Sequence, residues 1–303
     1  METAKTIPVD GGERFSDEAV AAMRARSGFS RAMRASAVRA LERCAQNRSF
    51  DRISRDSGQF LLAMLAFYLH VTGGLTVGRL QAFCVEAKLC SRGRAVALLV
   101  QLRLLGFVEP QPRRGDQRVT LYTPTAGMEG AFRIWLSDSL ETCAPLEPEA
   151  AVALARFDEP VVFDTFVKIF GEGVMAAARV HQPKHPSLAV ISGRAAGMLI
   201  LYDIMLRGPE VGPFPPTGAL HASAHELSRR FRVSRQHVMR LLAEAEGAGY
   251  LSRETQKSEC VIQPALREEI ELYFAIAFLS FGHCARETLR LAPEAPQLRF
   301  ATA

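Results

Sequence analysis

The chain has 303 residues, of which 48% are hydrophobic and 23% charged, a composition that excludes a globally disordered protein and suggests about two domains. Lysine and arginine outnumber aspartate and glutamate by 37 to 32, and the net charge of +5 is compatible with a polyanionic partner without indicating one. The six cysteines include no Cys-x-x-Cys pair, and residues 60–69, the longest apolar run, are too few to span a membrane. We therefore expect a cytoplasmic protein with reduced thiols, no signal peptide and no membrane contact.

Most of the chain has the composition and the apolar spacing of helices, so we expect a mostly α fold. In chain order, helices are predicted over residues 17–46 with a break near Gly28, 60–69, 127–143, 149–180, 188–206 and from Ala265 to before Pro293. Two prolines predict a loop over residues 181–186, and Gly73 and Gly74 are expected to close the apolar helix.

An internal repeat is the strongest pattern in the sequence. A shift of 143 residues aligns residues 90–108 with 233–251 without a gap, and further on the shift falls to 140. The identical pairs are Ser91/Ser234, Arg92/Arg235, Leu98/Leu241, Leu99/Leu242 and Gly106/Gly249. We interpret the chain as two divergent copies of one unit.

The second copy has the pattern of two helices followed by a hairpin. Ser223 and Glu226 form the capping-box pattern at the start of a helix over 224–231, and Ser234 is the expected cap of the next helix. Strands are predicted at 250–251 and 260–263, around a polar tip over 253–259. This order predicts a winged helix-turn-helix.

The first copy follows the same plan. Thr76 is the expected cap of a helix that runs to Cys84, and Ser91 is the expected cap of the next helix. Wing strands are predicted over 107–108 and 119–122, with a tip over 112–116.

The run from His225 to Leu242, followed by Gly249-Tyr-Leu, resembles winged-helix bacterial transcription regulators, most closely the MarR-like group. The segment Ser234-Arg-Gln-His-Val-Met-Arg has a fainter similarity to Crp/Fnr-type regulators. The resemblance covers roughly residues 61–125 and 198–264, and it implies sequence-specific binding to double-stranded DNA. Such regulators are normally shorter chains that dimerise. Here two units are fused, so we expect a monomer acting as a pseudo-dimer on an imperfect palindrome, with a homodimer left open.

The expected architecture is a pair of tandem winged helix-turn-helix units on a helical scaffold, related by a pseudo-twofold internal repeat. Its five segments are an N-terminal basic helical segment (1–56), a first winged helix (57–125), a central helical scaffold (126–195), a second winged helix (196–264) and a C-terminal helix and tail (265–303). The arginines of the first segment could extend a DNA footprint or accompany helix packing, and its small-residue face favours packing.

Positive charge is concentrated in the two repeated units. Residues 90–118 contain six arginines and two acidic residues, and residues 228–257 contain seven basic and three acidic residues, so each window has a net charge of +4. This distribution is what a surface that follows phosphates requires. The candidate DNA-binding residues are Ser91, Arg92, Arg94, Arg113, Arg114, Arg118, Ser234, Arg235, Gln236, His237, Arg240, Arg253 and Lys257.

Within this set, different roles are expected for the helices and the wings. Arg92, Arg94, Arg235, Gln236 and Arg240 are expected to reach base edges from the first turns of the recognition helices, and His237 to contact a base or a phosphate. Arg113, Arg114, Arg253 and Lys257 are expected at the wing tips, for phosphate or minor-groove contact.

Other classes of function find little support in the sequence. His221 and His225 have a metal-ligand spacing, but no third ligand is near, and no catalytic triad, phosphate loop or nucleotide-binding glycine pattern occurs. We therefore expect neither catalytic residues nor a metal or cofactor. Cys84 and Cys90 flank the first predicted turn, where inert thiols are favoured over a redox pair.

Two alternatives stay open. The first is a plasmid-type replication initiator, which also joins two winged helices, and the second is a winged-helix scaffold that binds protein. Outward apolar or acidic recognition helices would favour the scaffold, and the arginine content argues against it. The operator, the direction of regulation and a small-molecule effector do not follow from the sequence.

Overall fold

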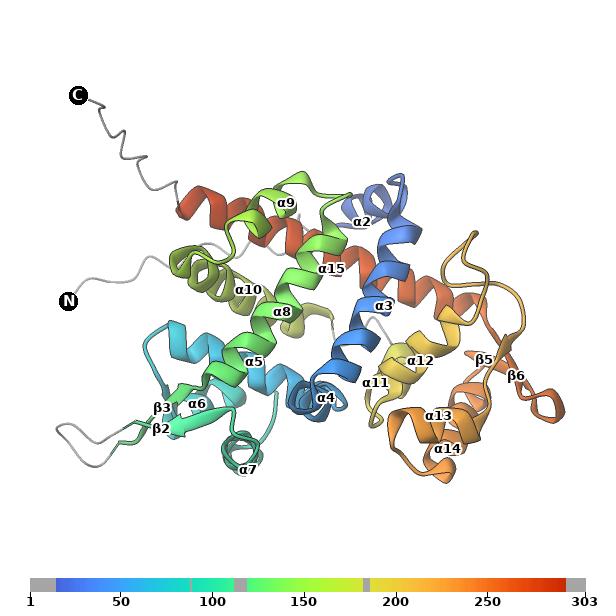
Figure 1. The fold of residues 1–303 in the computed structure, drawn as a ribbon, viewed down its shortest axis with the longest axis horizontal. Helices are drawn as coiled ribbons and strands as arrows, with labels where there is room; N and C mark the ends of the chain where they lie inside the picture. Colours follow the sequence, from blue (N-terminus) through green and yellow to red (C-terminus); the bar gives the residue numbers. More distant parts are fainter. Residues whose placement is uncertain (1–14, 88, 112–118, 182–185, 293–303) are drawn as a thin grey trace.

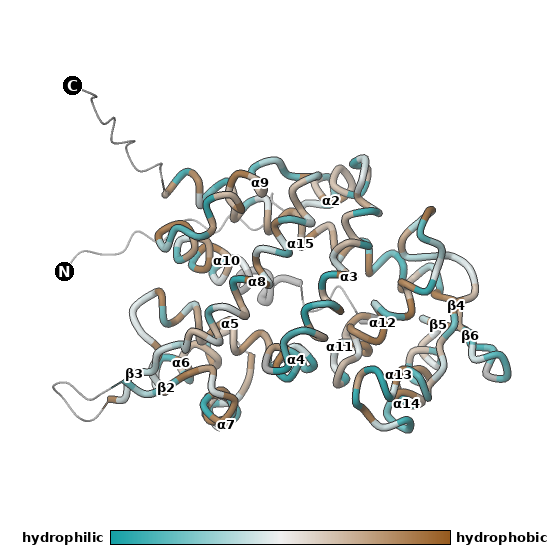
Figure 2. Tube along the Cα trace, in the orientation of Figure 1, coloured by the Kyte–Doolittle hydropathy of each residue, from teal (hydrophilic) through white to brown (hydrophobic). Residues whose placement is uncertain are grey.

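The computed structural model describes residues 15–87, 89–111, 119–181 and 186–292. The fold is mostly helical, and it contains two small antiparallel sheets that lie toward opposite ends of the molecule (Figure 1). Hydrophobic and hydrophilic residues alternate along the helices (Figure 2), and the apolar side chains of these helices supply most of the buried residues.

The N-terminal part consists of four helices: α2 (Asp17–Arg24), α3 (Phe29–Gln46), α4 (Arg48–Ser54) and α5 (Ser57–Val71). Gly28 separates α2 from α3 with φ 93°, a left-handed conformation that glycine adopts without steric cost, so the predicted break is confirmed. The side chains of Asn47 and Asp56 cap α4 and α5 by accepting hydrogen bonds from backbone N–H groups.

The first sheet lies in the segment that follows α5. This segment contains, in chain order, β1 (Leu75–Thr76), α6 (Val77–Glu86), α7 (Arg92–Leu104), β2 (Val108–Pro110) and β3 (Leu121–Pro124). The three strands form the sheet in the order β1-β3-β2. Val108 pairs with Pro124 and Leu75 pairs with Tyr122, both in antiparallel register. The hairpin strands begin one and two residues later than predicted, and β1 has only two residues, too few for a recognisable pattern.

The middle of the chain contributes α8 (Ala126–Cys143), α9 (Pro148–Ala155), α10 (Pro160–His181), α11 (Pro186–Ser192) and α12 (Gly197–Leu206). Two predicted continuous helices are therefore divided. The first is interrupted before Pro160, because a residue that precedes proline disfavours the helical conformation. The second is interrupted at Ala196, which has φ 58°, and α12 begins from there.

The second sheet repeats the element order of the first. Its segment contains, in chain order, β4 (Leu220–His221), α13 (Ala224–Phe231), α14 (Arg235–Gly247), β5 (Leu251–Glu254), a short 3-10 turn, η2 (Thr255–Lys257), and β6 (Glu259–Ile262). The three strands form the sheet in the order β4-β6-β5. The last element is α15 (Pro264–Leu291). Each sheet segment thus has the order helix, strand, two helices, hairpin, helix, with α5 and α8 flanking the first and α12 and α15 flanking the second.

One continuous apolar cluster joins the two sheet segments. Helix α15 packs against α2, α8, α9, α10 and α11, and α10 in turn packs against α5. Aromatic rings fill the space between these helices, among them Phe132, Trp135, Phe166, Phe170 and Phe281. Among the described helices, none combines the length and the apolar character needed to span a membrane.

The arginines of α2, of α3 and of the turn between them bind mainly within the molecule. Their ion-pair partners are Glu271 for Arg24, Glu147 for Arg26, Glu141 and Asp138 for Arg39, and Asp138 for Arg43. The Arg34 guanidinium lies 5.2 Å from the centre of the Phe214 ring. These contacts favour the packing role of the N-terminal arginines over an extended DNA footprint.

Candidate nucleic-acid interface

Helix α7 exposes two arginines at its first turn. Ser91 begins the helix, because its side-chain oxygen accepts a hydrogen bond from the backbone N–H of Arg94 at 3.3 Å. Burial of Ala95, Leu98, Leu99 and Leu102 fixes which face points inward. Arg92 and Arg94 are exposed, and within the described residues neither forms an ion pair. The first turn of α7 therefore exposes two guanidinium groups.

Helix α14 has the same construction. Ser234 accepts a hydrogen bond from the backbone N–H of His237 at 3.0 Å, and Val238, Leu241, Leu242 and Ala245 form the buried face. The exposed face carries Arg235, Gln236 and Arg240, and the arginines make no ion pair in the part of the chain that the structure describes. In both helices the serine oxygen is used by the cap, which leaves the serine hydroxyl as a hydrogen-bond donor for a partner.

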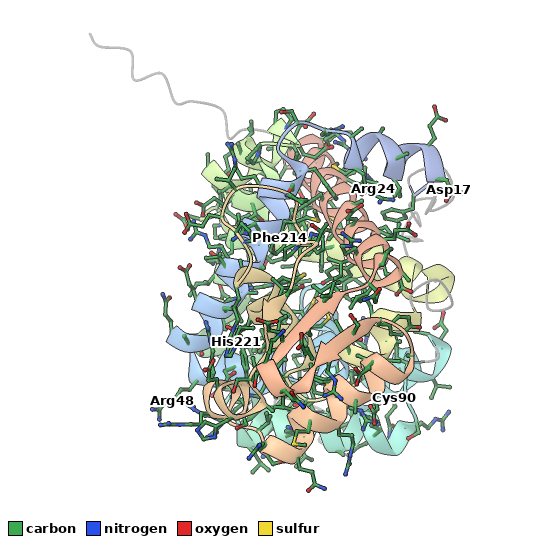
Figure 3. All side chains as sticks on the ribbon, turned by 90° about the vertical axis from the view of Figure 1, so that its right-hand side faces the viewer. Asp17, Arg24, Arg48, Cys90, Phe214 and His221 are labelled. Carbon is green, nitrogen blue, oxygen red and sulfur yellow. The ribbon has the colours of Figure 1, made fainter. Side chains whose placement is uncertain are left out.

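The two helices lie along the same edge of the molecule. Figure 1 shows α7 and α14 at the lower edge of the view, in its left and right halves, with the β2–β3 and β5–β6 hairpins on opposite sides. The view turned by 90° places Arg48 of α4 and Cys90, just before α7, low in the molecule (Figure 3). The first-turn arginines that the sequence could only assign to separate units thus belong to two helices at one edge of the view in Figure 1.

Helix α4 adds two arginines that the sequence analysis missed. Arg48 and Arg52 are exposed, while Phe50 and Ile53 are buried. The two arginines flank the buried Phe50 in the sequence, but nothing in this local pattern indicates which surface of the molecule they lie on.

His237, also in the first turn of α14, makes a contact within the molecule. Its Nε2 atom lies 2.9 Å from the backbone carbonyl oxygen of Ala195, and the side chain is half-buried. Next to it, Arg194 forms a bidentate ion pair with Glu244 of α14, with distances of 2.6 and 3.0 Å. His237 thus joins α14 to the turn before α12, and its expected contact with a base or phosphate stays a prediction.

The wing residues of the second segment also differ from expectation. Arg253 lies in β5 and not at the hairpin tip, and its side chain is only 20% exposed, because two guanidinium nitrogens bind Glu246 at 2.6 and 2.7 Å. This contact lowers the pKa of the Glu246 carboxyl. Lys257 is at the tip and exposed, where it pairs with Glu254 at 2.8 Å, a surface contact that a phosphate could replace. Arg113, Arg114 and Arg118 lie outside the described residues.

The outward faces of α7 and α14 differ beyond the first turn. Val100 and Leu104 on α7 are 46% and 83% exposed, and Ala97 is exposed beside them. Under the shift of 143 residues, Ala97 aligns with Arg240 of α14. One face is therefore apolar where the other carries a cation, so the two segments cannot present the same surface.

Other chemistry in these segments is structural. Glu226 does not complete the expected capping box with its side chain, which pairs instead with Arg207 and His221 at 2.9 and 3.2 Å. Burial and the neighbouring Cys90 raise the pKa of the Cys84 thiol to about 12, which favours an inert thiol over a redox pair. In the described ranges, no group of three or more His, Cys, Asp or Glu side chains could hold a metal ion.

Comparison with known proteins adds no relative. The chain matches no family model, no curated protein and no solved structure. The case for a function therefore rests on the residues and contacts described above.

Proposed function

We propose that the chain is a sequence-specific regulator of transcription that binds double-stranded DNA through two winged-helix units in one polypeptide. The observation that carries this proposal is the common edge on which α7 and α14 expose their first-turn arginines (Figure 1). Two helices on one edge can enter successive major grooves, as the two recognition helices of a dimer do. The shared order of elements in the two sheet segments supports the interpretation as winged helices.

The exposed side chains have the donors that base recognition needs. An arginine at the start of a recognition helix can donate two hydrogen bonds to guanine, and a glutamine can pair with adenine. Arg92 and Arg94 supply these donors in the first unit, and Arg235, Gln236 and Arg240 in the second. The exposed cations nearby would follow the phosphates; they are Arg48, Arg52, Arg229, Arg232 and Lys257.

The test begins with selection of bound sequences from a random pool of DNA duplexes. Arg235→Ala should weaken the selected site by about 1–3 kcal/mol and relax its preference at one position, if the side chain contacts a guanine edge. Arg52→Ala should weaken all sequences about equally, because phosphate contacts are independent of sequence.

The matched control is Arg290→Ala, which removes the same charge from an exposed arginine of α15 that pairs with Glu287. Its affinity should stay close to that of the unchanged protein. Equal losses for Arg235→Ala and Arg290→Ala would contradict the proposal, because the effect would then follow net charge alone.

A second candidate function concerns the first unit alone. The exposed Val100 and Leu104 make the outer face of α7 suitable for contact with a protein. If this face binds a protein, Leu104→Glu should abolish the protein contact and leave DNA binding unchanged. If the face lies against DNA, the added negative charge near the phosphates should weaken DNA binding.

A further inference from the structure

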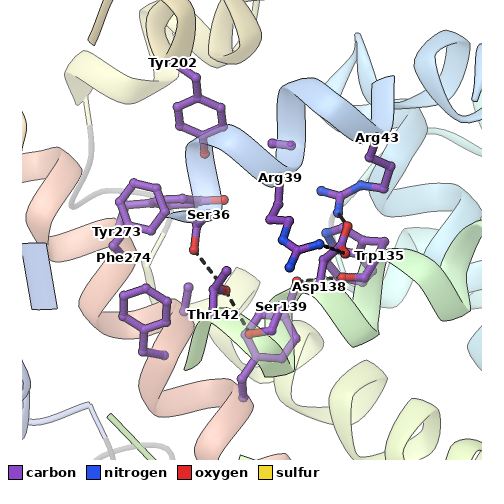
Figure 4. Close-up of a pocket in the computed structure, with 14 residues that line it drawn as sticks. Ser36, Arg39, Arg43, Trp135, Asp138, Ser139, Thr142, Tyr202, Tyr273 and Phe274 are labelled. Carbon is purple, nitrogen blue, oxygen red and sulfur yellow. Dashed lines mark hydrogen bonds and ion pairs between the residues drawn. The ribbon is translucent and has the colours of Figure 1, made fainter. Parts of the chain in front are cut away.

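Several polar groups that line a pocket between α3, α8, α12 and α15 bind one another (Figure 4). Arg39 and Arg43 both pair with Asp138, and the Ser36 hydroxyl bonds the Thr142 hydroxyl at 3.1 Å. These charges and hydroxyl groups serve the packing of the four helices. The outer face of α7 is different, because apolar side chains and arginines without an ion pair are exposed there in the described part of the chain.

The outer face of α7 is apolar along its centre. Ala97, Val100 and Leu104 follow one another at spacings of three and four residues, so they lie on one side of the helix, opposite the buried Ala95 and Leu102. Val100 and Leu104 are 46% and 83% exposed, and Ala97 is exposed as well. Apolar side chains that adjoin on an exposed face are typical of a surface that contacts a partner.

Gly93 extends this face into the first turn of α7, four residues before Ala97. A Cβ atom at Gly93 would meet no described atom within 4 Å, so the space above the helix backbone is open there. At the two aligned positions α14 carries Gln236 and Arg240, which are long side chains. The first two turns of α7 can therefore approach a partner more closely than those of α14 can.

The two sides of this apolar face are cationic. Arg92 and Arg94 lie on either side of Gly93, and Arg103 lies on the same side as Arg92. All three arginines are exposed, and α7 contains no acidic residue. The face is thus complementary to a groove with an apolar group on its floor and anions along both walls.

We propose that the first unit recognises a thymine in its half-site through Ala97, whose methyl group packs against the C5-methyl group of the base. The contact rests on the proposed function, because it requires α7 in a major groove. The phosphates of the two strands line this groove, and the apolar group that base pairs present on its floor is the thymine methyl. Recognition helices contact bases with their N-terminal residues, and Ala97 lies in the second turn of α7.

Deoxyuridine tests this contact at the level of one methyl group. In the duplex selected from the random pool, each thymine is replaced in turn by deoxyuridine, which removes the C5-methyl group and keeps the base pair. The half-site of the first unit is the one that Arg94→Ala weakens. At one thymine of this half-site, deoxyuridine should lower the affinity about fourfold, as expected for one methyl group that is no longer buried. Fluorescence anisotropy of the labelled duplex measures this loss.

Ala97→Gly removes the other methyl group of the contact. In this variant, the loss caused by deoxyuridine at that position should disappear, because each change removes the same interaction. The matched control is Ala151→Gly, which makes the same change at an exposed alanine of α9. Figure 1 shows α9 at the upper edge of the view and α7 at the lower edge, so the control should keep the full deoxyuridine loss.

Ala97→Arg should change the base that is preferred. It gives α7 the side chain that α14 carries at the aligned position 240, and an arginine there can donate two hydrogen bonds to guanine. The variant should therefore bind guanine at that position about fivefold or more tightly than thymine. A new preference of this kind cannot result from a variant that fails to fold.

Different outcomes separate the thymine contact from the proposed function. Failure to select any DNA sequence would contradict both. If a site is selected but its first half-site has no thymine, or binds equally well with deoxyuridine at every thymine, the thymine contact is wrong and DNA binding stands. The contact is also wrong if Ala97→Gly keeps the full deoxyuridine loss. A protein partner on this face of α7 would give affinities for DNA that do not depend on the thymine methyl groups.

Discussion

Buried charges in this protein are held by partners that are far away in the sequence. Glu147 is almost fully buried, and it binds Arg26 and Arg286, which are 121 and 139 residues away. Asp203 of α12 has a side chain that is only 2% exposed, and it binds Arg207, one turn further along the chain, and Arg230 of α13, beyond the intervening strand β4. Serine caps such as Ser91 were predictable because cap and helix are local, whereas no local pattern indicates which carboxylate a distant arginine meets.

The Asp203 network joins α12 to α13, so its removal should destabilise the second unit. We expect Asp203→Ala to lower the free energy of unfolding by about 1–3 kcal/mol, measured by urea denaturation. The loss stays below the cost of leaving a charge buried, because Arg207 and Arg230 are 22% and 54% exposed and can be hydrated. Asp158→Ala, at an exposed position, should change the free energy by less than about 0.5 kcal/mol. A similar small change for Asp203→Ala would show that the network does not stabilise the fold.

At the scale of elements, helices with a cap and a periodic apolar face could be predicted, and irregular connections could not. The sequence analysis located α7, α14 and α15 closely, because a serine cap or a proline starts each helix and the buried face repeats. The break before α12 was missed, because it depends on a left-handed alanine, which no propensity indicates. The strands β1 and β4 were missed because their pairing with β3 and β6 determines them, and not their own residues.

Because α10 packs closely on α5, the same glycine-to-alanine change should have opposite effects on stability at two positions of α10. A Cβ atom at Gly171 would lie 2.4 Å from a ring carbon of Tyr68, whereas a Cβ atom at Gly173 would meet nothing within 4 Å. Glycine to alanine in a helix interior adds about 1 kcal/mol of stability when space is free. Gly173→Ala should therefore stabilise the protein by about that amount.

Gly171→Ala gains the same helix propensity but must displace the Tyr68 ring, and overpacking costs about 1–3 kcal/mol. We expect a net loss of up to about 2 kcal/mol in urea denaturation. If both alanine variants stabilised the protein equally, the contact between α5 and α10 would be looser than described.

At the scale of the molecule, the sequence indicated two related units but not how they are arranged. The repeat and the charge windows pointed to residues 90–108 and 233–251, and both regions contain helices on one edge (Figure 1). Their relative placement depends on α3, α8, α10 and α15, whose packing involves contacts between distant segments. The same reason explains why Arg48 and Arg52 were missed, and why the contact between Arg253 and Glu246 could not be predicted.

The proposed function predicts a stoichiometry of one chain for each binding site. Because the outward faces of α7 and α14 differ, the two half-sites should differ as well, and Arg94→Ala and Arg240→Ala should affect different halves. Native mass spectrometry of the protein with its selected duplex should show one chain bound. Two chains on a perfect palindrome would mean that one helix of each chain makes no base contact.

The length of α15 has a consequence for the spacing of such half-sites. It is a single helix of 28 residues, about 42 Å long, which begins directly after β6 and reaches across to α9 and α10. Tandem DNA-binding modules joined by a flexible linker can adjust to different separations along the duplex. Here a rigid rod and a shared core fix the separation, and one inserted base pair would turn one half-site by about 34° relative to the other. The affinity for DNA would therefore depend on the distance between the half-sites as strictly as on their bases. A shift of a single base pair would abolish binding to a site even though every contacted base is unchanged.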